Sequence, residues 1–71
     1  MRFKNLEAEI KRAGESVETF AGRINLQKMT MYNRLNGKTN WTLTDMTRAQ
    51  AYLNEKTKQE LSLDYLFHID E

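Results

Sequence analysis

The chain has 71 residues, no cysteine and no proline, and its 11 basic and 10 acidic side chains give a net charge of +1. This length allows one small domain, residues 1–71, and the lack of cysteine excludes disulfide bonds and cysteine-rich zinc sites. The amino-terminal segment MRFKNLEAEI contains no long apolar run. We therefore expect no signal peptide, no membrane span and a cytoplasmic protein.

The first predicted helix covers residues 6–13. Asn5 is a plausible N-cap, and Gly14 can end the helix in the left-handed conformation. Leu6 and Ile10 lie four residues apart, which places both on the face toward the core. Because proline is absent and β-branched residues are scattered, the whole chain is predicted to be all-α.

Two short helices joined by a tight turn are predicted next, over residues 17–24 and 28–36. Ser16 can cap the first of them. Asn25 tolerates the left-handed conformation that turns the chain, and Gly37 supplies the same conformation after the second helix. The apolar residues expected to face inward are Phe20, Ala21, Ile24, Met31 and Leu35.

Gln27 immediately precedes the second of these two helices. Its longer amide caps a helix poorly compared with Ser or Thr. Two interpretations stay open at this position: Gln27 reaches a binding partner, or the fold simply tolerates it.

A fourth helix is predicted from residue 43 to residue 53 or 54, with the polar segment that follows able to prolong it. Thr42 and Asp45 have the spacing of a capping box. Ser62 can cap a short last helix that ends at Phe67. The apolar residues expected on one face of the fourth helix are Leu43, Met46, Ala49 and Leu53.

The charged residues are unevenly distributed along the chain. Residues 27–53 carry four basic side chains against one acidic, a balance of +3, and residues 54–71 carry two basic against five acidic, a balance of −3. The basic part coincides with the helix at 28–36 and the loop after it, an asymmetry suited to docking on phosphate. An ordinary mixed surface remains the alternative.

The segment 19–38 resembles the helix-turn-helix of the phage Cro and repressor family, also named the xenobiotic-response-element type. Three further segments resemble the family's first helix, the start of its fourth helix and its closing helix, at residues 5–9, 41–45 and 63–67. The resemblance implies a compact five-helix domain, with operator DNA bound by a homodimer. The residues that carry it in the motif are Phe20, Ala21, Ile24, Asn25, Leu26, Leu35, Asn36, Gly37 and Lys38.

In such a domain the outward side chains at the start of the second motif helix reach base edges in the major groove. Asn and Gln can form paired hydrogen bonds with adenine, and Lys can donate to guanine. The residues predicted to contact bases are Gln27, Lys28, Met29, Tyr32 and Asn33. Those predicted to contact phosphates are Arg34, Asn36, Lys38, Thr39 and Asn40.

A second hypothesis uses the same face against protein. Exposed Met and Tyr side chains, here Met29 and Tyr32, are enriched at protein interfaces. Val17 stands where many members of the family use Gln to hold a phosphate. The alternative is therefore an antirepressor or modulator that binds another phage repressor and blocks its DNA contacts. The sequence contains no catalytic constellation, metal-ligand set or cofactor-binding loop, so we expect no enzyme.

Overall fold

The computed structural model describes residues 2–70, which form five α-helices and no β-strand. The helices are α1 (Lys4–Arg12), α2 (Val17–Arg23), α3 (Lys28–Leu35), α4 (Leu43–Thr57) and α5 (Leu63–Leu66). The Cα radius of gyration is 10.8 Å. The prediction of a compact, five-helix, all-α domain is thus confirmed.

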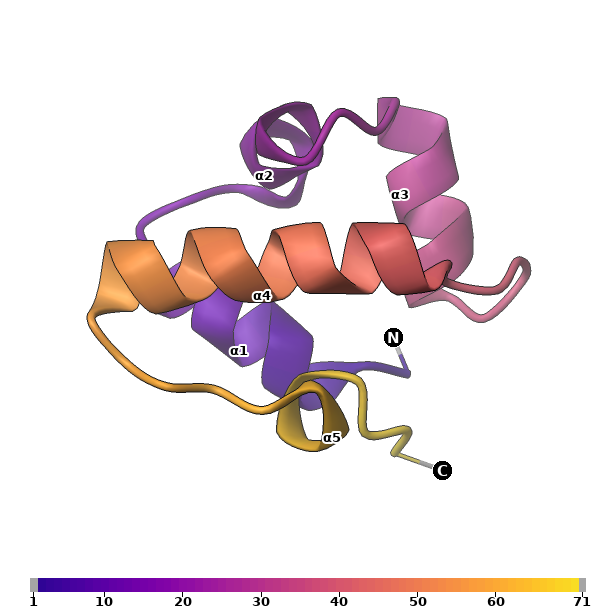
Figure 1. Ribbon diagram of the computed structural model, residues 1–71. Helices are drawn as coiled ribbons and strands as arrows, with labels where there is room; N and C mark the ends of the chain where they lie inside the picture. The colour runs from indigo at the N-terminus through magenta and orange to yellow at the C-terminus, as the bar shows by residue number, and fades with distance from the viewer. Residues whose placement is uncertain (1, 71) are drawn as a thin grey trace.

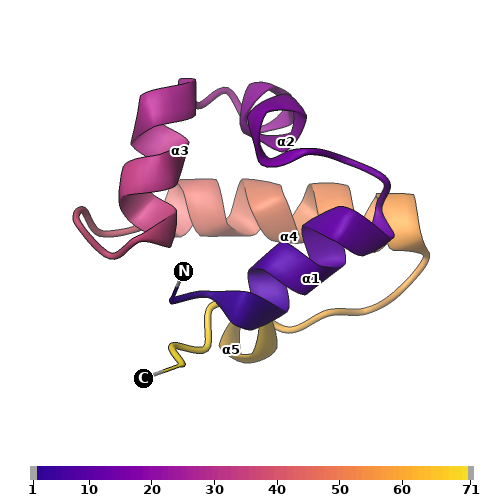
Figure 2. The ribbon, with the colours of Figure 1, turned by 180° about the vertical axis from the view of Figure 1, so that it is seen from behind.

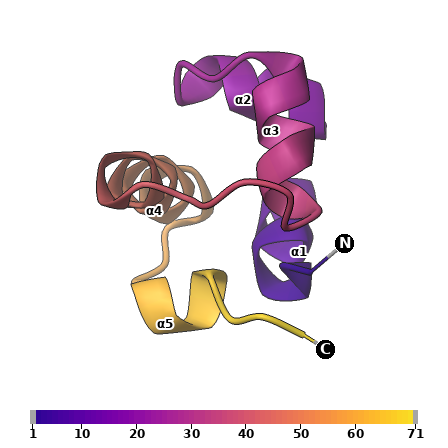
Figure 3. The same ribbon diagram turned by 90° about the vertical axis from the view of Figure 1, so that its right-hand side faces the viewer.

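The long helix α4 runs through the middle of the molecule (Figure 1). Helix α1 lies against it on the side seen in Figure 2 and also packs against α2 and α5. Backbone packing of α3 is chiefly against α2. Figure 3 shows the loop that leads from the end of α3 across to the start of α4. Helix α3 therefore lies at the periphery, with one face left for solvent.

Side chains from all five helices, and from the segment before α1, form one core. Trp41 packs edge-on against the rings of Phe3 and Phe67, with centroids 6.2 and 4.9 Å away. Burial of this apolar surface is the main stabilising contribution in so small a domain. The buried apolar residues are Phe3, Leu6, Ile10, Phe20, Ala21, Ile24, Met31, Leu35, Ala49, Leu53 and Leu66.

The predicted helix caps are largely confirmed. The hydroxyl of Ser16 accepts a hydrogen bond from the Thr19 amide at 3.1 Å, and the hydroxyl of Thr42 accepts one from the Asp45 amide at 3.2 Å. Ser62 caps α5 in the same way. These bonds satisfy amides that have no partner within the helix.

The two predicted chain reversals around α3 are also confirmed. Asn25 has a φ of 61° and Gly37 a φ of 79°, both in the left-handed region. The turn after α2 is short, so α2 and α3 pack directly against each other. The local sequence therefore fixes where α3 begins and where the chain leaves it.

The prediction for the first helix was wrong at its start. Helix α1 begins at Lys4, and Phe3 occupies the cap position without a side-chain cap. The side chain of Asn5 instead donates to the backbone carbonyl of Tyr65 at 3.0 Å. Because α5 supplies this acceptor, Asn5 joins α1 to α5 and does not cap α1.

The predicted inner face of α4 was partly wrong. Leu43 is 66% exposed, and Met46 is only half-buried. The inward stripe instead passes through Asp45, Ala49 and Leu53, which are spaced four apart on the helix. A carboxylate can occupy this stripe because α3 supplies its partner, as described below. The helix also extends to Thr57, beyond its predicted end.

Glu9 is a second buried carboxylate that the sequence did not predict. Its side chain is 2% exposed and forms an ion pair with Arg12 at 3.0 Å. The hydroxyl of Tyr65 donates to its other oxygen at 2.9 Å. This hydrogen bond, with burial, raises the pKa of Tyr65 above its ordinary value. The contact fastens α5 to α1.

Candidate nucleic-acid interface

Helix α3 has one buried and one open face. Met31 and Leu35 are fully buried, while Met29 is 68% exposed. The four-residue spacing of Met31 and Leu35 places both on the inner side, which leaves the opposite side of α3 open. This outer face is the candidate site, and it combines with the loop 36–40 that follows.

The five residues predicted to contact bases differ in exposure. Gln27, Lys28 and Met29 are exposed, and Tyr32 and Asn33 are half-buried. Gln27 forms no cap hydrogen bond, so its amide is free of the helix it precedes. Three of the five residues therefore lie exposed at the start of α3, and the other two lie half-buried one turn later.

Lys28 has a carboxylate neighbour on α2. Its amino group lies 3.2 Å from Glu18, and both side chains are more than half exposed. Exposed ion pairs of this kind contribute little because water and salt screen them. Lys28 thus remains available to a partner, although Glu18 lowers the local positive charge.

The loop after α3 carries the other predicted contacts. Asn36, Lys38, Thr39 and Asn40 are all exposed, and the Lys38 amide donates to the carbonyl of Asn33 at 2.8 Å. This hydrogen bond ties the start of the loop back to the last turn of α3. The polar groups of the loop therefore stand in a defined position relative to α3.

Arg2 adds a basic residue beside this loop that the sequence did not place there. A Cβ on Gly37 would lie 2.6 Å from the Arg2 side chain. The backbone amide of Arg2 also donates to the carbonyl of Leu35 at 3.1 Å. This bond satisfies one of the carbonyls left open at the end of α3. The sequence could indicate only that Arg2 is basic, and not that it lies beside this loop, because Arg2 is distant from the loop in sequence.

Arg34 differs from the exposed phosphate contact that the sequence suggested. Its guanidinium donates to the carboxylate of Asp45 in the first turn of α4 and lies 5.7 Å from the centre of the Trp41 ring. The Arg34 and Asp45 side chains are 14% and 12% exposed. The hydrogen bond from Arg34 holds the pKa of Asp45 below its ordinary value, although burial acts in the opposite direction.

Arg48 completes this small ionic cluster on α4. Its guanidinium lies 4.0 Å from the other oxygen of Asp45, and its side chain is about half exposed. Two cations therefore share one carboxylate. The cluster keeps a positive charge, and the exposed part of that charge belongs to Arg48.

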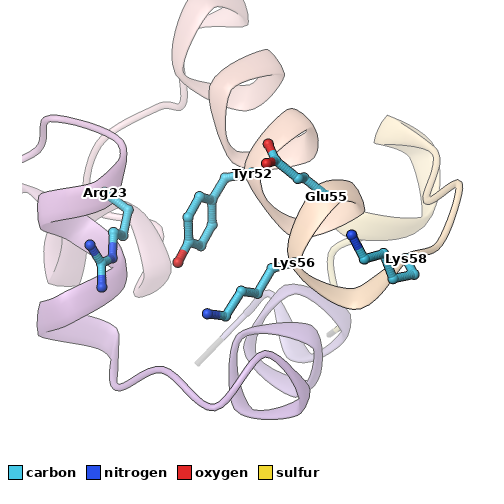
Figure 4. A pocket seen from close by; sticks show the side chains of 5 residues that line it. All are labelled: Arg23, Tyr52, Glu55, Lys56 and Lys58. Carbon is cyan, nitrogen blue, oxygen red and sulfur yellow. The ribbon is translucent and has the colours of Figure 1, made fainter.

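A separate hollow of about 540 Å³ is lined by one residue of α2 and by residues from the second half of α4 and its C-cap. Figure 4 shows these side chains: Arg23, Tyr52, Glu55, Lys56 and Lys58. Arg23 is engaged with Glu15 at 3.1 Å.

Within residues 2–70, no three His, Cys, Asp or Glu side chains come together as a metal site would require. None of the helices in this part of the chain has the length and apolarity needed to cross a bilayer.

No family model matches this chain, and the searches of curated proteins and of solved structures found no match either. The identification of this surface as a candidate interface therefore depends on its geometry and on the sequence pattern.

Proposed function

We propose that this chain is a sequence-specific DNA-binding transcriptional regulator of the Cro-like repressor type, which inserts α3 into the major groove of operator DNA. The observation that carries the proposal is the combination of one open, polar helix face with an exposed polar loop directly after it. An α-helix fits the major groove, and a loop at its end can reach the flanking phosphates.

The roles within the surface follow from side-chain chemistry. Gln27 and Asn33 can each form paired hydrogen bonds with adenine, and Lys28 can donate to guanine. Lys38, with the amide and hydroxyl groups beside it, suits phosphate oxygens. Met29 and Tyr32 can contact a thymine methyl group or sugar edges. Arg2 extends the basic edge of the loop.

A homodimer on a two-fold site is part of the proposal. One α-helix of this length contacts only a few base pairs, so a single copy gives limited discrimination. Two copies on half-sites one helical turn apart double the contacts and match the symmetry of a palindromic operator. We therefore expect half-sites about 10 base pairs apart, centre to centre.

The proposal is tested by selecting bound duplexes from a random-sequence pool with the purified protein. We expect enrichment of a short two-fold motif, followed by binding to that motif whose logarithmic affinity falls linearly with the logarithm of salt concentration. Failure to enrich any motif, together with no salt-dependent binding to DNA, would overturn the proposal.

A second candidate function is favoured by one observation, the 68% exposure of Met29 on the outer face of α3. A flexible apolar side chain at the centre of a surface is typical of a protein contact. The surface also has little free charge, because Arg34 is engaged by Asp45 and Lys28 has Glu18 nearby. The alternative is a modulator that binds another repressor protein and blocks its DNA contacts.

A further inference from the structure

The Arg34–Asp45 pair connects two helices whose backbones pack little against each other. Arg34 belongs to the last turn of α3 and Asp45 to the first turn of α4. The main backbone packing of α3 is against α2, so the side of α3 toward α4 depends on side-chain contacts. The guanidinium reaches across, donates to the carboxylate and covers the face of Trp41.

The same pair determines how many cations the surface offers to phosphate. Arg34 precedes the exposed loop 36–40 by only two positions, and its side chain is long enough to reach outward. Its low exposure of 14% shows that Asp45 holds it inside. A guanidinium in a charge-assisted hydrogen bond does not leave its partner without a cost in free energy.

A contact between a protein cation and a phosphate raises the affinity for every DNA sequence alike, whereas base contacts distinguish one sequence from another. A cation held away from the phosphate backbone therefore lowers affinity for every DNA sequence alike and leaves the ratio of specific to random affinity unchanged. A helix held in a fixed position preserves the alignment that base contacts need. The positioning effect of the Arg34–Asp45 contact therefore acts on selectivity, and the withheld cation acts on overall affinity and its salt dependence.

We propose that the Arg34–Asp45 pair is a selectivity element of the DNA-binding surface: it positions the end of α3 against α4 and withholds one cation from the phosphate backbone. Arg34 and Asp45 are positioning residues and contact no base. This inference rests on the proposed function. It assigns to Arg34 the opposite of the phosphate role that its sequence position suggests.

Asp45→Asn is the decisive variant, because it removes the charge that holds Arg34 and keeps the size of the side chain. Binding is measured against the selected motif and against a random-sequence duplex over a series of salt concentrations. We expect affinity for random DNA to rise, the salt slope to steepen by about one unit, and the ratio of specific to random affinity to fall. Arg34→Gln should leave the slope unchanged and lower the ratio.

The double variant Arg34→Gln, Asp45→Asn separates the two effects. It should return the salt slope to that of the parent, while selectivity stays as low as in the Arg34→Gln variant, since the two residues act as one unit. Asp64→Asn is the matched control: it makes the same charge change on α5, away from α3 (Figure 1). Its slope and selectivity should equal those of the parent, because salt screens distant charges.

Circular dichroism verifies the fold of each variant. If Asp45→Asn fails to fold, Arg34→Gln decides alone, because a slope lower by about one unit would mean that Arg34 contacts phosphate after all. Unchanged slope and selectivity in both single variants would overturn the inference while leaving the proposed function intact. A parent protein that binds neither duplex would overturn both.

Discussion

Asp45 is a residue whose environment acts on its charge in two opposite directions. Burial disfavours the charged carboxylate and raises its pKa, while the hydrogen bond from Arg34 lowers it. The second effect is the larger, so the pKa of Asp45 lies below its ordinary value. A group of this kind stabilises the fold as long as it stays ionised.

This balance predicts how stability depends on pH. Because the folded-state pKa of Asp45 is lowered, its contribution is complete above the unfolded pKa, near 3.8, and is lost as pH falls through the folded value. We expect the free energy of unfolding in urea to decrease below about pH 4. Asp45→Asn should reduce stability at pH 7 by about 1.5–3 kcal/mol, the range for hydrogen bonds to charged groups.

Comparing the unfolding free energies of the parent and of Asp45→Asn across pH isolates the contribution of the Asp45 carboxylate. Other acidic groups change protonation in the same range in both proteins, so the difference between the two curves belongs to Asp45. The difference in unfolding free energy between the parent and Asp45→Asn should decrease from pH 6 toward pH 2.5. A gap that stays constant over this range would mean that the Arg34–Asp45 contact contributes nothing through its charge.

Lys38 and Asn33 are predicted to have different roles within the proposed DNA-binding surface. Lys38→Ala should weaken binding to selected and random duplexes alike and lower the salt slope by about one unit, because it removes a phosphate contact. Asn33→Ala should instead narrow the difference between the two duplexes by about 1–3 kcal/mol, because it removes a base contact. Titration by fluorescence anisotropy at several salt concentrations measures both quantities.

The two variants serve as controls for each other. Both residues lie on or just after α3, and neither is part of the core, so folding should be preserved in both. Loss of selectivity in Lys38→Ala with an unaltered slope would place Lys38 on a base and contradict the assignment.

At the level of the helices, local signals in the sequence predicted three N-caps correctly and the inner face of α4 less well. Ser16, Thr42 and Ser62 cap their helices as expected, since capping involves residues only three apart. The inner face of α4 depends on which helix lies opposite. Asp45 lies on the inner face because Arg34 of α3 donates a hydrogen bond to its carboxylate. The residues next to Asp45 in the sequence do not indicate this contact.

Leu35 and Leu43 provide a matched pair for testing which face of each helix is buried. Leu35 is fully buried at the end of α3, whereas Leu43 is 66% exposed at the start of α4. Leu35→Ala should cost about 2–5 kcal/mol in unfolding free energy. Leu43→Ala should change it by less than about 0.5 kcal/mol. Urea unfolding, followed through the single tryptophan, measures both.

The predicted loss for Leu35→Ala is large relative to the whole. A domain of this size has a total stability on the order of 4–10 kcal/mol, so the variant should unfold at a much lower urea concentration. Equal losses in the two variants would mean that α3 and α4 do not present the faces described.

At the scale of the whole molecule, the two ends of the described chain meet beneath the candidate interface. The amide of Asp70 donates to the carbonyl of Arg2 at 2.9 Å, and the amide of Arg2 donates to Leu35. The closing segment thereby supports the end of α3 through the opening segment. Sequence patterns could not predict this, because backbone hydrogen bonds between distant segments carry no residue-type signal.

The candidate site itself was predictable in its main part. Helical periodicity separates buried Met31 and Leu35 from the exposed Met29, and this needs only the spacing of residues. The internal contact of Arg34 was not predictable in this way, because an Arg in the last turn of an exposed helix has the same sequence pattern whether it meets a ligand or an internal carboxylate.

The two candidate functions make opposite predictions for Met29 and Tyr32. Against DNA, these side chains contribute modest apolar contact, because bases are read mainly through polar edges. Against a protein groove, an exposed Met beside a Tyr can be the central anchor, and loss of such an anchor often costs about 2 kcal/mol or more. A Met29→Ala, Tyr32→Ala double variant should keep its fold, since Met29 is exposed and Tyr32 is half-buried.

Parent and double variant are titrated in parallel against the selected DNA and against a repressor protein encoded beside this chain. Under the DNA-binding proposal, the parent binds DNA tightly with a steep salt dependence, and the double variant retains most of that affinity because its phosphate contacts remain. A stable complex between parent and repressor that the double variant fails to form, together with negligible binding of the parent to DNA, would establish the modulator function instead. Lys38→Ala completes the design, because it should weaken the DNA complex and leave a repressor complex centred on Met29 nearly unchanged.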